Sequence, residues 1–110
     1  IRPGARLSGA STHHGLCWLA GQTADDLTQD VKGQTKQILD KIDKFLKDAG
    51  TDKSKLLQAV IWLQDIRVVD EFNKVWDAWV VAGSCPARAC IEARLQSPAK
   101  MIEIQVTAAR

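Results

Sequence analysis

The C-terminal part of the chain contains two stretches in which apolar and polar residues alternate with period two. This pattern is typical of strands that bury one face. In residues 87–95 one face carries Ala87, Ala89, Ile91, Ala93 and Leu95, and the other carries Arg88, Cys90, Glu92 and Arg94. In residues 101–108 the expected core face carries Ile102, Ile104, Val106 and Ala108. Because only a short segment with Pro98 separates the two stretches, we expect an antiparallel pair.

An apolar stripe at helical spacing runs through the middle of the chain. It consists of Leu27, Val31, Ile38, Ile42, Phe45, Leu46 and Ala49. Thr23 is the expected N-cap, with Asp26 in the first turn, and Gly50 is the expected stop. The pattern predicts an amphipathic helix of about 23–25 residues.

Shorter patterns complete the predicted order of elements. Residues 5–12, 16–20 and 55–64 favour strands, and a stripe from Phe72 to Val80 favours a second helix that ends at Gly83. The order β-β-α-β-α-β-β predicts an α+β sandwich, in which two helices cover one face of the sheet. We expect the other face to carry Arg88, Cys90, Glu92, Arg94, Glu103 and Gln105. Such a face is either solvated or used in assembly, and the apolar positions beside the charges favour assembly.

Length and composition restrict the class of protein. The chain has 110 residues, of which 45% are hydrophobic and 25% charged, so we expect one ordered domain over residues 1–110. The net charge is only +2 and the basic residues are spread along the chain, which argues against a nucleic-acid partner. The sequence offers no apolar run near the ~20 residues of a membrane span and no signal peptide, so we expect no membrane partner.

The cysteines favour a reducing compartment. Three are present, so they cannot all pair with one another, and no C-x-x-C motif occurs. His13 and His14 are adjacent rather than spaced for chelation, so we expect no metal site. We therefore predict a cytoplasmic protein with free thiols.

Arg88 and Glu103 are the first candidates for chemistry. Arg88 follows Pro86-Ala87 at the start of a predicted strand, where its guanidinium could bind a carboxylate through two hydrogen bonds. The alternative is a surface arginine paired with a nearby acid. Glu103, between Ile102 and Ile104, could act as a general base or orient a water molecule. Its alternative is a cross-strand ion pair, since the hairpin register places it near Arg94.

The predicted hairpin separates these two residues. Its register sets them about five residues apart, which is roughly 16–17 Å at ~3.3 Å per residue. Two groups at that distance cannot share a small ligand within one regular hairpin. We therefore expect that, if they cooperate, a neighbouring subunit or a bulge brings them together.

Two further polar residues and three tryptophans have competing interpretations. Cys90 lies two residues after Arg88, but no histidine is placed by sequence to activate it, so a pocket-lining thiol is favoured over a nucleophile. Asn73 either caps the second helix or binds a ligand. We expect Trp62, Trp76 and Trp79 in the core, because basic residues do not alternate with them as in a strand-binding groove.

Several segments together resemble one known family. Residues 86–95 (PARACIEARL), followed by residues 101–104 (MIEI), resemble the C-terminal signature of the Rid (YjgF-like, reactive intermediate deaminase) family. Residues 18–22 (WLAGQ) are similar to its strand-ending segment. Residues 72–83 (FNKVWDAWVVAG) resemble its second helix, particularly in the YoaB-type subgroup.

The resemblance implies a chorismate-mutase-like fold that assembles as a homotrimer with sites between subunits. It implies hydrolysis of 2-imino acids or enamines to 2-keto acids and ammonia without a cofactor. Arg88 would hold the substrate carboxylate and Glu103 would position a water molecule. Gly21, Asn73 and Cys90 would line the pocket.

Two positions depart from the deaminase pattern. Ala20 stands where the deaminase branch usually has serine, and residues 6–8 (RLS) lack the usual first-strand tyrosine. Both departures favour the alternative function, a non-catalytic trimer that binds small carboxylates or a partner protein. The retention of Arg88 and Glu103 keeps the enzyme interpretation ahead.

Overall fold

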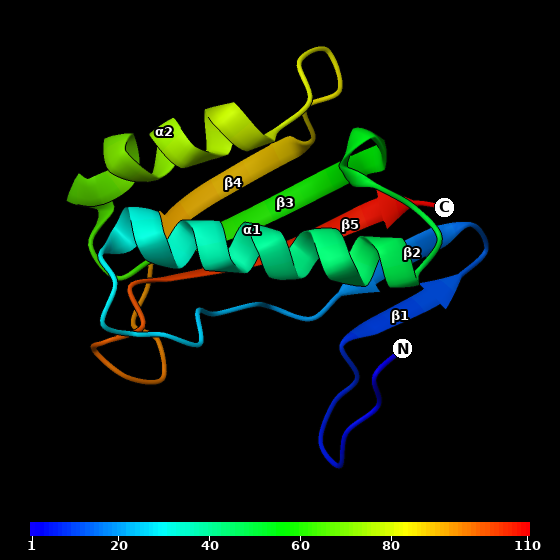
Figure 1. The fold of residues 1–110 in the computed structure, drawn as a ribbon, viewed down its shortest axis with the longest axis horizontal. Helices are drawn as coiled ribbons and strands as arrows, with labels where there is room; N and C mark the ends of the chain where they lie inside the picture. The colour runs from blue at the N-terminus through cyan, green and yellow to red at the C-terminus, as the bar shows by residue number, and fades with distance from the viewer.

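Every residue from 1 to 110 is described by the computed structural model. The two α-helices lie on the same face of one five-stranded sheet, as Figure 1 shows, so the α+β sandwich is confirmed. The helices are α1 (Val31–Asp48) and α2 (Val69–Trp79), and the strands are β1 (Ala10–His13), β2 (Leu16–Leu19), β3 (Leu56–Leu63), β4 (Ala87–Glu92) and β5 (Ile102–Ala109).

The sheet is mixed, and its order corrects the predicted C-terminal hairpin. The strand order is β1-β2-β5-β3-β4, so β3 lies between β4 and β5. β3 pairs parallel with β4 and antiparallel with β5. The prediction of an antiparallel pair of residues 87–95 and 101–108 was therefore wrong. Alternation sets which residues share a face, but it does not determine which strand is the neighbour.

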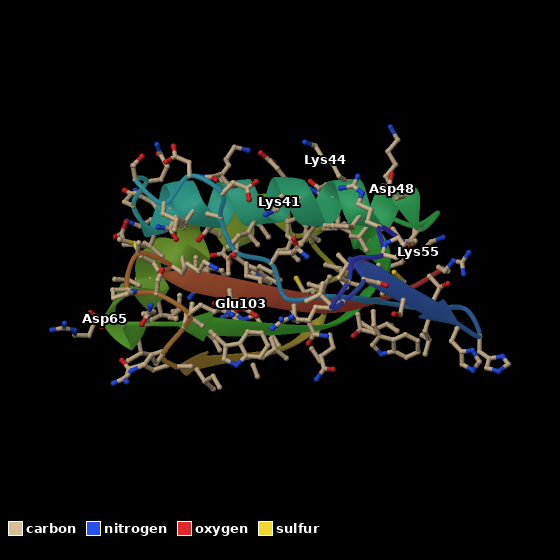
Figure 2. All side chains as sticks on the ribbon, turned by 90° about the horizontal axis from the view of Figure 1, so that it is seen from below. Lys41, Lys44, Asp48, Lys55, Asp65 and Glu103 are labelled. Carbon is tan, nitrogen blue, oxygen red and sulfur yellow. The ribbon has the colours of Figure 1, made fainter.

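The face assignment is right for β5 and wrong for β4. Ile102, Ile104, Val106 and Ala108 are buried beneath the helices, as predicted. In β4 the polar set faces the helices, because Arg88 and Cys90 are in register with the buried residues Ala59 and Ile61 of β3. The small residues Ala87 and Ala89, with Ile91, are exposed on the opposite face, which no helix covers. We call this uncovered side the open face (Figure 2).

The first helix begins later than predicted. Asp30, not Thr23, caps α1, and its carboxylate accepts a hydrogen bond of 2.8 Å from the Gly33 N–H. Lys41 and Gln37 instead bind residues 23–26 as a loop along the helix, through the Thr23 carbonyl and the Asp25 and Asp26 N–H groups. The predicted stop is confirmed, because Gly50 has φ +79° and donates to the Lys47 carbonyl at 3.0 Å.

The second helix and the core agree with the stripes. Phe72 and Trp76 of α2 are buried against the sheet. The helix ends at Trp79, before the predicted Gly83, because Val80 adopts an extended conformation. The largest fully buried side chains come from α1, α2 and the strands: Leu19, Ile38, Leu39, Ile42, Leu46, Ile61, Leu63, Phe72, Ile102 and Ile104. Neither helix has both the length and the apolar character that crossing a bilayer requires.

Candidate functional site

Arg88 is held in a fixed position on the helix side of β4. Its Nη1 donates to the Asn73 Oδ1 of α2 at 2.9 Å. The guanidinium carbon lies 5.5 Å from the ring centroid of Phe72 and 5.6 Å from that of Trp76. These two cation–π contacts and the single hydrogen bond orient the group but leave most of its N–H donors free. We call Arg88, Asn73, Cys90, Phe72 and Trp76 the arginine half-site.

The arginine half-site follows from two periodicities. Period two in β4 puts Cys90 on the same face as Arg88, and the spacing of Phe72 and Trp76 puts both rings on one side of α2. Arg88 forms no ion pair with a carboxylate of its own chain. The alternative of an arginine paired with a nearby acid is therefore not what the structure shows. An anion from outside the chain can approach the exposed guanidinium.

Cys90 is a partly buried thiol beside this cation. Burial raises the pKa of Cys90, and the positive charge of Arg88 opposes that increase only in part. A raised pKa keeps the side chain in the neutral thiol form near pH 7. This supports the interpretation of Cys90 as a pocket-lining group rather than a nucleophile.

Glu103 lies on the open face of β5, next to Gly21. A Cβ atom added at Gly21 would clash with the Glu103 carboxylate, so glycine is what permits this close approach. Reciprocal backbone hydrogen bonds of 2.8 and 3.1 Å between Gln22 and Ile104 hold the two segments together. The Gly21 N–H donates to no acceptor within the chain. We call Gly21 and Glu103 the glutamate half-site.

The surroundings of Glu103 contain no paired cation. The carboxylate lines a hollow of about 420 Å³ together with Trp62, Ala93, Arg94, Leu95 and Gln96. Arg94 is exposed there and forms no ion pair with Glu103, contrary to the cross-strand alternative. Trp62 is half-buried on the open face rather than in the core, which corrects its predicted position. Figure 2 labels Glu103 on β5.

The two half-sites lie on opposite faces of the sheet. Arg88 is in register with Ala59, whereas Glu103 is in register with Trp62, and these two β3 residues point to opposite sides. One small ligand therefore cannot contact both charged groups within one chain. The sheet itself separates the two residues, not the predicted distance along a hairpin. Neither Arg88 nor Glu103 has an ion-pair partner in its own chain.

Several neighbours of the site could not be recognised from the sequence. Asn73 does not cap α2, because the helix begins at Val69; it binds Arg88 instead. Phe72 and Trp76 were assigned only to the core, yet their rings also support the guanidinium. The available signal was the aromatic pair Phe72 and Trp76, four residues apart on the same helix as Asn73. The register that brings Arg88 beneath α2 could not be read from the sequence.

Comparisons with known proteins agree with the fold and the motif. The family model described as Endoribonuclease L-PSP matches residues 1–110. A RutC family protein of Haemophilus ducreyi is 41% identical over 104 residues, covering 94% of this chain and 89% of that protein. The RutC family protein YoaB of Escherichia coli K12 is 38% identical over 105 residues, covering 96% and 91%.

A solved structure is equally similar. The crystal structure of NMB1025, a YjgF family member from Neisseria meningitidis, matches with a TM-score of 0.97 and 42% identity, covering 100% of this chain and 92% of that one. Rv2704 from Mycobacterium tuberculosis, at 24% identity and a TM-score of 0.88, shares the fold. The chain belongs to the Endoribonuclease L-PSP (YjgF/Rid) family, as the motifs at residues 86–95 and 101–104 predicted.

Proposed function

We propose that this protein hydrolyses 2-imino acids, or their enamine tautomers, to 2-keto acids and ammonia. The active form would be a homotrimer with its sites between subunits. The observation that carries the proposal is that two charged residues without an ion-pair partner lie on opposite faces of the sheet. Arg88 lacks an anion, and Glu103 lacks a cation, on opposite faces of the same sheet. Bringing the arginine half-site of one subunit to the glutamate half-site of its neighbour would complete both.

The chemistry requires few groups. One water molecule adds to the iminium carbon, the C–N bond of the resulting carbinolamine breaks, and one keto acid and one ammonium ion are released. Arg88 would hold the substrate carboxylate, with Asn73 and the two rings fixing its orientation. Glu103 would take a proton from the attacking water and return it to the leaving nitrogen. An iminium is already electrophilic, so positioning supplies most of the catalysis.

The remaining residues would shape the pocket. Gly21 leaves room for the Glu103 carboxylate and offers a free N–H donor, and Cys90 contributes a neutral thiol. No step of this mechanism requires a cofactor. The three free cysteines favour a reducing cytoplasm as the place of action.

A coupled assay tests the activity. An amino-acid oxidase generates 2-imino acids in place, and semicarbazide traps the fraction that has not been hydrolysed. We expect the wild-type protein to lower the trapped imine and Arg88→Ala to abolish the effect. If the wild-type protein is inactive toward 2-imino acids with several different side chains, the enzyme proposal is wrong.

Mixing two inactive variants tests the location of the site. Arg88→Ala and Glu103→Gln are each expected to be inactive as homotrimers. After unfolding and refolding together in equal amounts, about a quarter of the intersubunit sites should combine an intact Arg88 with an intact Glu103. We therefore expect about a quarter of wild-type activity to return. If no activity returns, then either both residues act within one subunit or they take no part in the reaction.

The alternative is a trimer that binds small carboxylates, or a partner protein, without turnover. Ala20 and the absence of tyrosine favour it, because two polar groups of the deaminase pattern are missing. Saturable binding of 2-ketobutyrate to the wild-type protein, lost in Arg88→Ala and accompanied by no imine hydrolysis, would favour this function. The family description as an endoribonuclease is less favoured for this chain, because its net charge is only +2.

A further inference from the structure

A hollow larger than the one beside Glu103 contains neither Arg88 nor Glu103, but it borders the glutamate half-site and shares Gly21 with it. It measures about 800 Å³ and is bounded by residues 2–9, by the loop of residues 20–25 and by one side of α1. Four cationic side chains line it: Arg2, Arg6, Lys41 and Lys44. The only acidic residue in the lining is Asp25. We call this feature the basic groove.

Two of the four cations already have partners. Lys41 donates to the Thr23 carbonyl and to Asp25, both at 2.9 Å, and so binds the loop to α1. Arg2 pairs with Asp48 at 2.8 Å, and its guanidinium carbon lies 4.6 Å from the ring centroid of Phe45. Figure 2 shows Lys41, Lys44 and Asp48 in succession along α1. These contacts fix the walls of the groove.

The other two cations are unpaired. Neither Arg6 nor Lys44 forms an ion pair or a side-chain hydrogen bond within the chain. Even with Asp25 included, the lining keeps a surplus of positive charge. Positive groups that gather in one concave site repel one another and attract an anion with more than one negative charge.

We propose that the basic groove binds a phosphate-bearing small molecule. Arginine and lysine are the side chains that bind phosphate oxygens most readily, and Arg6 and Lys44 would be the principal donors. The groove also contains apolar surface from Leu7 and Phe45, and its volume lies within the range of small-molecule sites. An organic group attached to the phosphate would lie against Leu7, which is 63% exposed.

Calorimetric titration of the full chain tests this inference. The probes are phenyl phosphate, a dianion at pH 7.5, and benzoate, a monoanion with the same ring. We expect saturable binding of phenyl phosphate, at least tenfold weaker binding of benzoate, and at least a tenfold loss of phosphate affinity in Arg6→Ser/Lys44→Ser. The control Lys36→Ser/Lys55→Ser removes the same charge from exposed lysines outside the groove and should bind as the wild-type protein does. Equal binding by the two double variants, or no binding at all, would overturn the proposal.

Two further arms separate the basic groove from other sites. Arg88→Ala and Glu103→Gln should retain phosphate binding, since the groove is defined by other charges; loss of binding in Arg88→Ala would mean that the phosphate occupies the arginine half-site. A single-stranded RNA ten-mer that binds more tightly than phenyl phosphate, and depends equally on Arg6 and Lys44, would contradict a small-molecule site. The result does not depend on imine hydrolysis, so either proposal can fail alone.

Discussion

Gly21 is the residue on which the glutamate half-site depends most directly. Its absence of a side chain allows the Glu103 carboxylate to lie against the backbone of the β2–α1 loop. The motif resemblance predicted that Gly21 and Glu103 contribute to one pocket. The sequence could not show that they touch, because the contact depends on the bridge between Gln22 and Ile104, which are far apart in the chain.

Gly21→Ala should therefore impair function more than folding. The backbone of Gly21 is not in the left-handed region, so alanine is tolerated there, but its methyl group must displace the Glu103 carboxylate. We expect at least a tenfold fall in imine hydrolysis and a melting temperature within a few degrees of wild type. In the double variant Gly21→Ala/Glu103→Gln the two losses of imine hydrolysis should not add, because both substitutions act through the Glu103 carboxylate. Additive losses would show that Gly21 acts independently of Glu103.

The three cysteines should differ in reactivity. Cys85 is exposed, whereas burial raises the pKa of Cys90 and of the fully buried Cys17. A raised pKa lowers the thiolate fraction at any pH below it, so alkylation by iodoacetamide at pH 8 should proceed in the order Cys85, Cys90, Cys17. Peptide mass spectrometry measures each rate.

Arg88→Ala gives a directional control for this experiment. The positive charge of Arg88 lowers the pKa of Cys90, so removing this charge should slow the alkylation of Cys90 relative to Cys85. Faster alkylation of Cys90 in the variant would mean that Arg88 shields the sulfur sterically more than it stabilises the thiolate.

At the scale of elements, local patterns predicted both α-helices and all five strands, but not all of their ends and partners. The helix predicted from the apolar stripe between Val31 and Ala49 was correct, because residues buried on one side of a helix recur with the helical period. The start of α1 was misplaced because both Thr23 and Asp30 are good caps, and only the tertiary contacts of Lys41 and Gln37 decide between them. The pairing of β4 with β3 likewise depends on α2 as the crossover between parallel strands.

The two candidate caps can be distinguished by their contribution to stability. Asp30→Ala should lower the free energy of unfolding by about 1 kcal/mol, because the Gly33 N–H loses its acceptor. Thr23→Ala should change it by less than about 0.5 kcal/mol, since the hydrogen bond between Thr23 and α1 uses the backbone carbonyl, which alanine keeps. Urea unfolding followed by circular dichroism measures both. A larger effect of Thr23→Ala would contradict the position of the helix start.

At the scale of the whole molecule, the open face is the feature that a single chain leaves unexplained. α1 and α2 bury one side of the sheet, while the other side exposes Ile91 at 49% and Trp18 at 38% of their surfaces. Both half-sites contain charges without a counterpart. Assembly through the open face would remove apolar surface from water and could bring complementary halves together at the same time.

Ile91→Glu should therefore disrupt both assembly and activity. A carboxylate on the open face cannot be buried against an apolar partner surface without a large desolvation cost. We expect light scattering coupled to size exclusion to give three times the chain mass of 12.1 kDa for the wild-type protein and one chain mass for the variant. Imine hydrolysis should fall with the loss of trimer, because Arg88 and Glu103 cannot meet within one chain. Ile66→Glu is the matched control, because Ile66 is 39% exposed but lies outside the strands. A monomeric variant that keeps full activity would show that one chain builds the whole site.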